Sequence, residues 1–359
     1  MGGTDHSAAA SRAGGGIRPE RGCPFGSHRA GGGLPQPAER VDPALPIWSN
    51  ELLIKVETLN LDSSSMRQIA ESCGGDEARM RARIAEIVRN RGKMHNPVTG
   101  SGGVLVGRVA AIGPDFPRGD LAPGDRICTM VSLSLTPLVL DSIGAIDIKT
   151  AQIEATGRAI LFESGLYAAM PADVPPAVAL SLFDVAGAPG TILREARPGE
   201  TVLVMGAGKA GSLSLLAARE AIGSDGRLIA ADASPAAAEA ARGLGVADEV
   251  LTLDLRDPIG TYAALQKATR GWLADLVVNT TNVPGTEGAA ILATRQGGRV
   301  FFFSMATSFT AAALTAEGVG RDITMLIGNG YTAGWVDATL RLYRQSPALQ
   351  ALMERARAG

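Results

Sequence analysis

The sequence predicts an α/β protein with two domains, a β-rich domain followed by a doubly wound parallel sheet. Three observations predict this architecture. The chain has 359 residues, which is long for a single domain. Short apolar runs joined by glycine- and proline-containing turns fill its first half. From about Pro189 onward, strand-like runs alternate with helical patterns, which is typical of a parallel sheet with crossover helices.

The composition narrows the class of partner. The net charge is −2, so we expect neither a nucleic-acid partner nor a membrane surface, and no apolar run approaches the ~18 residues of a membrane span. The cysteines Cys23, Cys73 and Cys128 form no C-x-x-C pair, which favours a reducing cytoplasm over a disulfide framework or a structural zinc site. Residues 1–21 are rich in Gly, Ala and Arg without periodicity, so we expect a disordered tail or a misplaced start.

The first domain is expected over residues 22–188. Residues 47–61 contain the alternation of a half-buried strand, and two helical pieces separated by Gly74 and Gly75 follow over 66–91. After a glycine-rich loop at 93–103, further strands are expected over 104–113, 118–130, 131–140 and 159–169.

The second domain is expected over residues 189–330. Six apolar runs predict its parallel strands, at 202–205, 228–231, 249–253, 275–279, 299–304 and 323–327. Ser234 and Pro235 are a helix start signal, because a hydroxyl caps the helix and proline suits its first position. Residues 331–355 are expected to be mostly helical.

The strand at 202–205 leads directly into G-x-G-x-x-G at Gly206–Gly211 and then into a helical pattern. Gly206 permits the tight turn, Gly208 leaves room for a pyrophosphate against the backbone, and Gly211 lets the helix pack closely on the strand. The helix N-terminus then faces the phosphates. The alternative is a glycine-rich turn that binds no nucleotide.

The acid Asp232 ends the next strand, at about the distance from the glycines expected for a ribose-binding carboxylate. A carboxylate there accepts hydrogen bonds from the 2′-hydroxyl and repels a 2′-phosphate, so NAD is favoured over NADP. Further cofactor contacts are expected in the glycine loop and after the fourth and fifth strands, at Lys209, Ala210, Thr281, Asn282, Ser304 and Met305.

A β-rich domain with these turns, followed by a dinucleotide-binding domain, resembles the medium-chain dehydrogenase/reductase superfamily. The segments that carry the resemblance are Glu51–Thr58, Gly107–Gly113, Pro123–Arg126, Gly206–Gly211 and Leu244–Gly245. It implies a GroES-like catalytic domain, a Rossmann domain, a C-terminal segment 331–359 that packs back on the catalytic domain, and a homo-oligomer, either a dimer or a tetramer.

Longer segments are similar to the L-erythro-3,5-diaminohexanoate dehydrogenase family, among them CPFGSHR (23–29), HNPVTGSGG (95–103), ILFESGLYA (160–168) and FFFSMATSF (301–309). This resemblance runs from about Gly22 almost to the C-terminus. It implies an enzyme of lysine fermentation that uses NAD and water to deaminate a small diamino acid. The expected products are 5-amino-3-oxohexanoate, ammonium and NADH.

Zinc members of the superfamily carry Cys, His and Cys near positions that here hold Asp62, Gly103 and Asp184, so we expect no metal. An amine must lose a proton before hydride leaves, and a positioned carboxylate suits that step or the anchoring of the second ammonium. Asp62 and Asp184 are the candidates, although Asp62 is equally placed to cap a helix. Glu163 is either a substrate contact or an edge-strand charge.

His95 is the one histidine outside the N-terminal segment, and it either shuttles protons or stabilises its loop. Lys93, Ser64, Thr99 and Ser101 are candidates for binding the substrate, with a solvated lysine as the alternative for Lys93. Two other functions stay open: a zinc-free enone or quinone reductase or an alcohol dehydrogenase using NAD(P)H, and a protein that senses NAD or binds a methyl donor.

Overall fold

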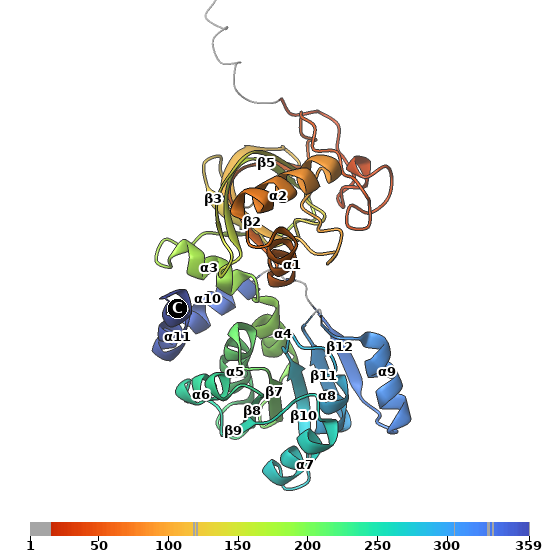
Figure 1. Ribbon diagram of the computed structural model, residues 1–359, viewed down its shortest axis with the longest axis vertical. Helices are drawn as coiled ribbons and strands as arrows, with labels where there is room; N and C mark the ends of the chain where they lie inside the picture. Colours follow the sequence, from red (N-terminus) through yellow and green to blue (C-terminus); the bar gives the residue numbers. More distant parts are fainter. Residues whose placement is uncertain are drawn as a thin grey trace, which may run out of the picture. The chain divides into compact units, whose positions relative to one another are not determined.

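The computed structural model describes residues 16–117, 119, 121–304, 306–328, 331 and 334–358 (Figure 1). The chain divides into two compact units, Met1–Leu180 and Ser181–Gly359. The sequence placed the boundary at residue 188. The structure moves it earlier because the helix α4, Gly187–Glu195, packs on helices of the second unit.

The first unit is built on a six-stranded sheet in the order β4-β5-β1-β2-β3-β6. Its strand pairs are antiparallel. The strands are β1 Leu52–Leu61, β2 Gly103–Ile112, β3 Arg126–Thr129, β4 Leu138–Asp147, β5 Gln152–Leu161 and β6 Tyr167–Ala169. The expected strand over 131–140 is wrong for its first seven residues, which form turns. The long β4–β5 pair was missed in part because much of β4 is exposed and lacks a clear apolar face.

Two helices follow β1, as the split at Gly74 and Gly75 predicts: α1, Ser63–Cys73, and α2, Glu77–Arg91. They pack on each other, and α2 packs on β4. The apolar stripe of α2 is buried, with Met80 and Ile84 at 0% exposure. This stripe joins the inward side chains of β1 in one hydrophobic core, and the core fixes where the two helix starts lie.

The second unit holds a six-stranded parallel sheet in the order β12-β11-β10-β7-β8-β9. All six expected strands are present: β7 Thr201–Met205, β8 Arg227–Asp232, β9 Glu249–Thr252, β10 Ala274–Asn279, β11 Thr294–Phe302 and β12 Thr324–Ile327. Successive residues of β7, Val202 to Met205, are all buried, because helices cover both faces of a parallel sheet.

The helices of this unit are α5 Lys209–Ile222, α6 Pro235–Gly243, α7 Pro258–Ala268, α8 Glu287–Ala293 and α9 Phe309–Gly318. Ser234 caps α6 as predicted, since its hydroxyl accepts from the amide of Ala237. The chain runs outward from β7 to β9 and then returns to β10 on the other side of β7. Ligands of such sheets bind at the carboxyl ends of the strands beside this reversal.

The C-terminal helices α10, Trp335–Gln345, and α11, Pro347–Ala358, correct one expectation. They were expected to pack on the first domain. Instead α10 packs on α4 and α5, and α11 packs on α10 and α5, so both belong to the second unit. Their apolar residues, including the buried Leu340 and Leu349, have a partner within that unit.

The prediction of a disordered tail through residue 21 is wrong for the last residues of that range. Ile17 pairs with Ile47 in an isolated bridge, and the amide of Arg18 donates to the carbonyl of Ile47 at 2.7 Å. Residues 1–15 lie outside the described part of the chain. Within that part, no single helix is long and apolar enough to cross a membrane. Only the bent pair of α4 with α3, Pro176–Phe183, reaches the required length and composition, when the two helices are counted together.

Candidate active site

The glycine loop after β7 has the geometry that its motif predicts. Gly206 has a φ of +89°, which favours glycine. A Cβ on Gly211 would lie 1.9 Å from the carbonyl oxygen of Gly206, whereas a Cβ on Gly208 would meet nothing within 4 Å. Gly211 therefore permits close packing of helix on strand, and Gly208 leaves open space beside the N-terminus of α5. These residues fit the pyrophosphate of a dinucleotide.

Asp232 ends β8 and links that strand to the glycine loop. Its Oδ2 accepts from the amide of Ala207 at 2.7 Å, and its Oδ1 accepts from the amide of Ser234 at 2.8 Å. The carboxylate thus lies at the carboxyl ends of β7 and β8, and Asp232 is partly exposed to solvent. That position suits recognition of a ribose.

The expected cofactor residues after β10 and β11 are held in local hydrogen bonds. The Thr281 hydroxyl donates to Oδ1 of Asn279 at 2.6 Å, and the Ser304 hydroxyl donates to Oδ1 of Asn282 at 3.0 Å. Ala210 lies half-buried in the first turn of α5. Met305 lies outside the described residues.

Lys209 begins α5, but its ammonium does not point to open solvent. Its Nζ lies 3.0 Å from Oδ2 of Asp184, in an ion pair whose side chains are 34% and 25% exposed. The hydroxyl of Tyr331 donates to the backbone carbonyl of Asp184 at 2.9 Å. A predicted phosphate contact and a predicted catalytic acid are therefore partners in this structure.

In the first unit, Asp62 immediately precedes α1. The expected alternative, a side-chain cap of that helix, is not formed. Instead, Oδ2 of Asp62 accepts from the amide of Gly102 at 2.9 Å, so the carboxylate connects the start of α1 to the glycine-rich loop. The side chain remains partly exposed.

Beside Asp62 lies a cluster of hydroxyl groups from α1 and the loop before β2. The Ser65 hydroxyl lies 2.6 Å from those of Thr99 and Ser101, which are 3.0 Å apart, and Ser64 reaches Ser101 at 3.5 Å. The structure thus brings the predicted Ser64, Thr99 and Ser101 together. Sequence reasoning missed Ser65, the buried centre of the cluster. Its place in the run Ser63–Ser65, at a helix start, was the available signal.

His95 belongs to the same loop and is half-buried. Its Nδ1 is buried and has no hydrogen-bond partner among the described residues. Burial, followed by the charges of Lys93 and Arg91, lowers the pKa of His95 below its ordinary value. At neutral pH the ring is therefore a neutral base.

The prediction that Lys93 binds the substrate carboxylate is wrong. Its side chain is fully buried, and its Nζ donates to the backbone carbonyls of Pro35 at 2.6 Å and Gln36 at 3.0 Å. Burial and the charge of Arg91 lower the pKa of Lys93 to about 8. The lysine therefore anchors the N-terminal segment.

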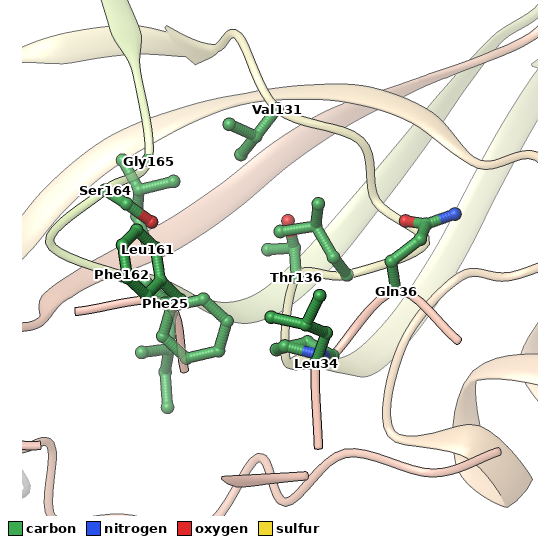
Figure 2. A pocket seen from close by; sticks show the side chains of 12 residues that line it. Phe25, Leu34, Gln36, Val131, Thr136, Leu161, Phe162, Ser164 and Gly165 are labelled. Carbon is green, nitrogen blue, oxygen red and sulfur yellow. The ribbon is translucent and has the colours of Figure 1, made fainter. Parts of the chain in front are cut away.

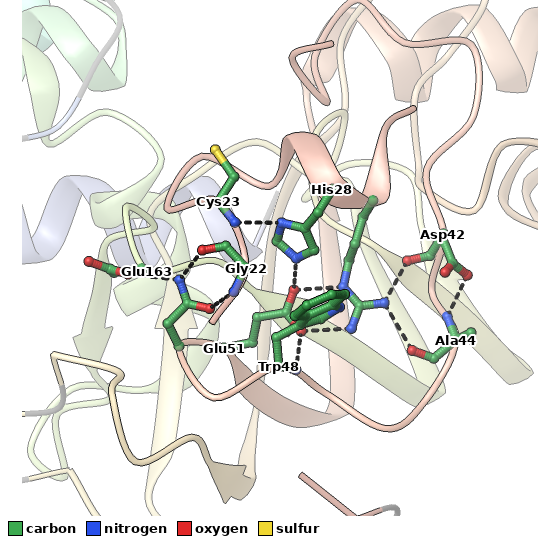
Figure 3. Close-up of polar contacts among 10 residues, drawn as sticks. Gly22, Cys23, His28, Asp42, Ala44, Trp48, Glu51 and Glu163 are labelled. Carbon is green, nitrogen blue, oxygen red and sulfur yellow. Dashed lines mark hydrogen bonds and ion pairs between the residues drawn. The ribbon is translucent and has the colours of Figure 1, made fainter. Parts of the chain in front are cut away.

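Glu163 is also corrected from a substrate contact to a structural anchor. Its carboxylate pairs with Arg21 at 2.5 Å. It also accepts from Nδ2 of Asn50 at 2.8 Å, a contact drawn beside Glu163 in Figure 3. These hydrogen bonds, first from Asn50 and then from Arg21, lower the pKa of Glu163. Both partners lie far away in the sequence, so the alternation of one strand could not indicate them.

Figure 3 also shows a buried network around Glu51. Arg29 donates to both carboxylate oxygens at 2.6 Å, His28 lies 2.9 Å from Oε1, and the amide of Trp48 donates to Oε2 at 2.9 Å. The amide of Cys23 donates to Nδ1 of His28 at 2.9 Å. The network therefore joins residues 23–48 to Glu51, the residue directly before β1.

A cavity of about 230 Å³ lies between this segment and the strands (Figure 2). Phe25, Leu34, Val131 and Phe162 are among its lining residues, and none of the lining residues within the described chain is ionisable. A substrate with ammonium and carboxylate groups needs charged or strongly polar partners. The hydroxyl cluster at Asp62 meets that need better than this cavity. No group of three or more His, Cys, Asp or Glu side chains among the described residues is arranged to hold a metal ion.

The parallel sheet with its glycine loop and the antiparallel unit with its acidic, hydroxyl-rich loop together have the architecture of a two-domain dehydrogenase. Alcohol dehydrogenase TADH from Thermus sp. ATN1 has the same fold, with a TM-score of 0.53, 20% identity, and coverage of 89% of this chain and 91% of that one.

Sequence comparison identifies the particular family. L-erythro-3,5-diaminohexanoate dehydrogenase of Acetoanaerobium sticklandii is 45% identical over 342 residues, which are 93% of this chain and 99% of the relative. The enzyme of the same name from Fusobacterium nucleatum is 43% identical over 338 residues, 93% of this chain and 98% of that relative. The family model of the N-terminal domain of this dehydrogenase matches residues 28–171. The chain belongs to the L-erythro-3,5-diaminohexanoate dehydrogenase family.

Proposed function

We propose that this protein catalyses the NAD-dependent oxidative deamination of L-erythro-3,5-diaminohexanoate. The products are 5-amino-3-oxohexanoate, ammonium and NADH, as in lysine fermentation. The observation that carries the proposal is 45% identity over nearly the whole length of a dehydrogenase of that name. Asp62, where zinc members of the superfamily place a ligand, agrees with a substrate whose activation is loss of a proton from nitrogen.

The reaction requires two proton transfers to groups of the protein. The 3-ammonium must first lose a proton, because only the neutral amine has the lone pair that expels hydride from C3. NAD, when bound, supplies the acceptor for that hydride. Water then adds to the iminium carbon and loses a proton to a base. The nitrogen of the resulting carbinolamine takes up a proton while its hydroxyl gives one up, so that ammonia leaves and is then protonated to ammonium. Asp62 is a partly exposed carboxylate suited to accepting these protons, and the neutral ring of His95 is a second base.

The hydroxyl cluster is proposed to bind the substrate carboxylate. The hydroxyls of the buried Ser65, of Thr99 and of Ser101 lie within 3.0 Å of one another near the N-terminus of α1, and the Ser64 hydroxyl lies 3.5 Å from that of Ser101. Hydroxyl donors at a helix N-terminus suit an anion, because the helix dipole also favours negative charge there. Asp184 is proposed as the carboxylate that holds a substrate ammonium.

NAD is proposed over NADP because Asp232 places a negative charge at the end of β8. A 2′-phosphate would meet that charge, whereas ribose hydroxyls would donate to it. Because lysine fermentation draws on the intracellular NAD pool, we place the reaction in the cytoplasm. We also propose a homo-oligomer, a dimer or a tetramer, which the exposed edge strand β12 supports.

The direct test is formation of NADH from NAD and 3,5-diaminohexanoate, with simple alcohols assayed in parallel. We expect turnover of the diamino acid, and turnover of alcohols alone would contradict the proposal. Asp62→Asn should lower kcat by about a hundredfold or more while NADH affinity stays unchanged. Asp141→Asn, an exposed acid on β4, is the charge-matched control.

A further inference from the structure

The ion pair of Lys209 with Asp184 competes with a contact between the same lysine and a phosphate of the cofactor. Lys209 is the first residue of α5, next to the open space at Gly208 where a pyrophosphate would lie. A lysine at a helix N-terminus is well placed to contact a phosphate. In this structure its Nζ is instead 3.0 Å from Oδ2 of Asp184.

Asp184 is held independently of that lysine. The Tyr331 hydroxyl donates to its backbone carbonyl at 2.9 Å, so the residue has an anchor that does not involve its carboxylate. The side chains of Lys209 and Asp184 are 34% and 25% exposed, so neither is locked in a closed core. The ammonium can therefore turn to another anion while Asp184 stays in place.

We propose that a bound pyrophosphate draws Lys209 away from Asp184, and that this exchange of partners frees the Asp184 carboxylate for the substrate ammonium. Lys209 is thus a positioning residue that couples the two ligands. The cofactor must bind first, because an amine that arrives earlier meets a carboxylate already neutralised by lysine. This inference rests on the proposed function for the identity of the amine, but the exchange itself is a property of cofactor binding.

The exchange predicts that one variant binds NADH more tightly than the wild type does. Asp184→Asn removes the competitor for Lys209, so NADH should bind more tightly, by roughly two- to fivefold, the range expected for a partly exposed ion pair. Lys209→Met should weaken NADH binding by roughly tenfold, since a charge-assisted contact to phosphate is lost. In the Lys209→Met background, Asp184→Asn should have no further effect.

The experiment is a fluorescence titration of the full-length protein with NADH for the wild type, both single variants and the double variant. Asp254→Asn and Lys267→Met are matched controls, because they change the same charges at exposed positions of the second unit. Lys209→Gln replaces Lys209→Met if the latter does not fold, as judged by circular dichroism.

Calorimetric titrations with ADP-ribose and with adenosine show which part of NADH causes the change in affinity. ADP-ribose keeps the pyrophosphate and should show the same tightening with Asp184→Asn, whereas adenosine lacks it and should not. Unchanged or weaker NADH binding by Asp184→Asn overturns the exchange. Equal tightening with and without Lys209 also overturns it, because that result indicates simple repulsion between Asp184 and phosphate. A wild-type protein that binds no NADH overturns the proposed function itself.

Discussion

At the scale of single residues, the ionisable side chains differ in which partners the fold gives them. Lys93 and Glu163 were attractive substrate ligands by position, yet each is engaged by the N-terminal segment. Asp62 has a partly exposed carboxylate, one oxygen of which accepts from the amide of Gly102. Partners more than a hundred residues away, such as Arg21 for Glu163, decide which of these groups remain available.

The buried carboxylate of Glu51 gives a prediction about stability. Burial opposes its charge, but hydrogen bonds from Arg29 and His28 outweigh burial and lower the pKa. Glu51→Gln leaves the Arg29 guanidinium buried without a counter-charge, so we expect a loss of ~3–5 kcal/mol in the free energy of unfolding, measured in urea. Glu57→Gln, which removes partly exposed pairs with Arg108 and Arg126, should cost less than ~1 kcal/mol.

The sign of the pH dependence follows from the lowered pKa of Glu51. Its contribution is fully present above the pKa of an unfolded glutamate, ~4.3, and is lost as the pH falls toward the folded value. The stability gap between the wild type and Glu51→Gln should therefore narrow in acid. A gap that is independent of pH would contradict the ionised pair.

Lys93 gives a prediction of the same sign at alkaline pH, because its pKa is also lowered in the folded state. Its pKa is lowered from 10.5 to about 8, chiefly by burial, so between these values the folded state binds fewer protons than the unfolded state. The wild type should therefore gain stability relative to Lys93→Met as the pH rises through this window, by up to ~1.4 kcal/mol per pH unit. Urea unfolding across the window measures this gain, and Lys55→Met, an exposed lysine on β1, should show none.

At the scale of elements, the junction of β7 and α5 shows how one loop uses glycine for two purposes. Gly211 is required by packing, because its Cβ would overlap the carbonyl of Gly206. Gly208 is not required by the fold, since its φ of −69° suits any residue and its Cβ would meet no atom within 4 Å. The remaining reason for glycine at Gly208 is the approach of a ligand.

Alanine substitutions separate these two purposes. Gly208→Ala should leave the urea midpoint unchanged and weaken NADH binding by roughly tenfold or more, because the new methyl group occupies the space left for phosphate. Gly211→Ala should lower stability by ~1–3 kcal/mol through overpacking. Gly243→Ala in α6, which also meets no atom within 4 Å, is the control for binding. A destabilised Gly208→Ala with normal NADH affinity would reverse the assignment.

At the scale of the whole molecule, local signals predicted the elements better than their assembly. The six parallel strands and the paired helices α1 and α2 follow from apolar periodicity and glycine positions, which are local properties. The unit to which α10 and α11 belong, and the ion pair of Lys209 with Asp184, depend on contacts between distant segments. No pattern within one window of sequence contains that information.

Assembly of several copies is the last property argued at this scale. Among the strands that the structure describes, β12 pairs on one side only and so lies at an edge of the parallel sheet, with Ile327 at 62% exposure. Such an edge favours pairing with another chain, and a charge on it opposes pairing. Ile327→Lys should therefore lower the mass of the oligomer in light scattering, whereas Trp272→Lys, at a residue that is 79% exposed before β10, should not. An unchanged mass for Ile327→Lys would exclude β12 as the interface.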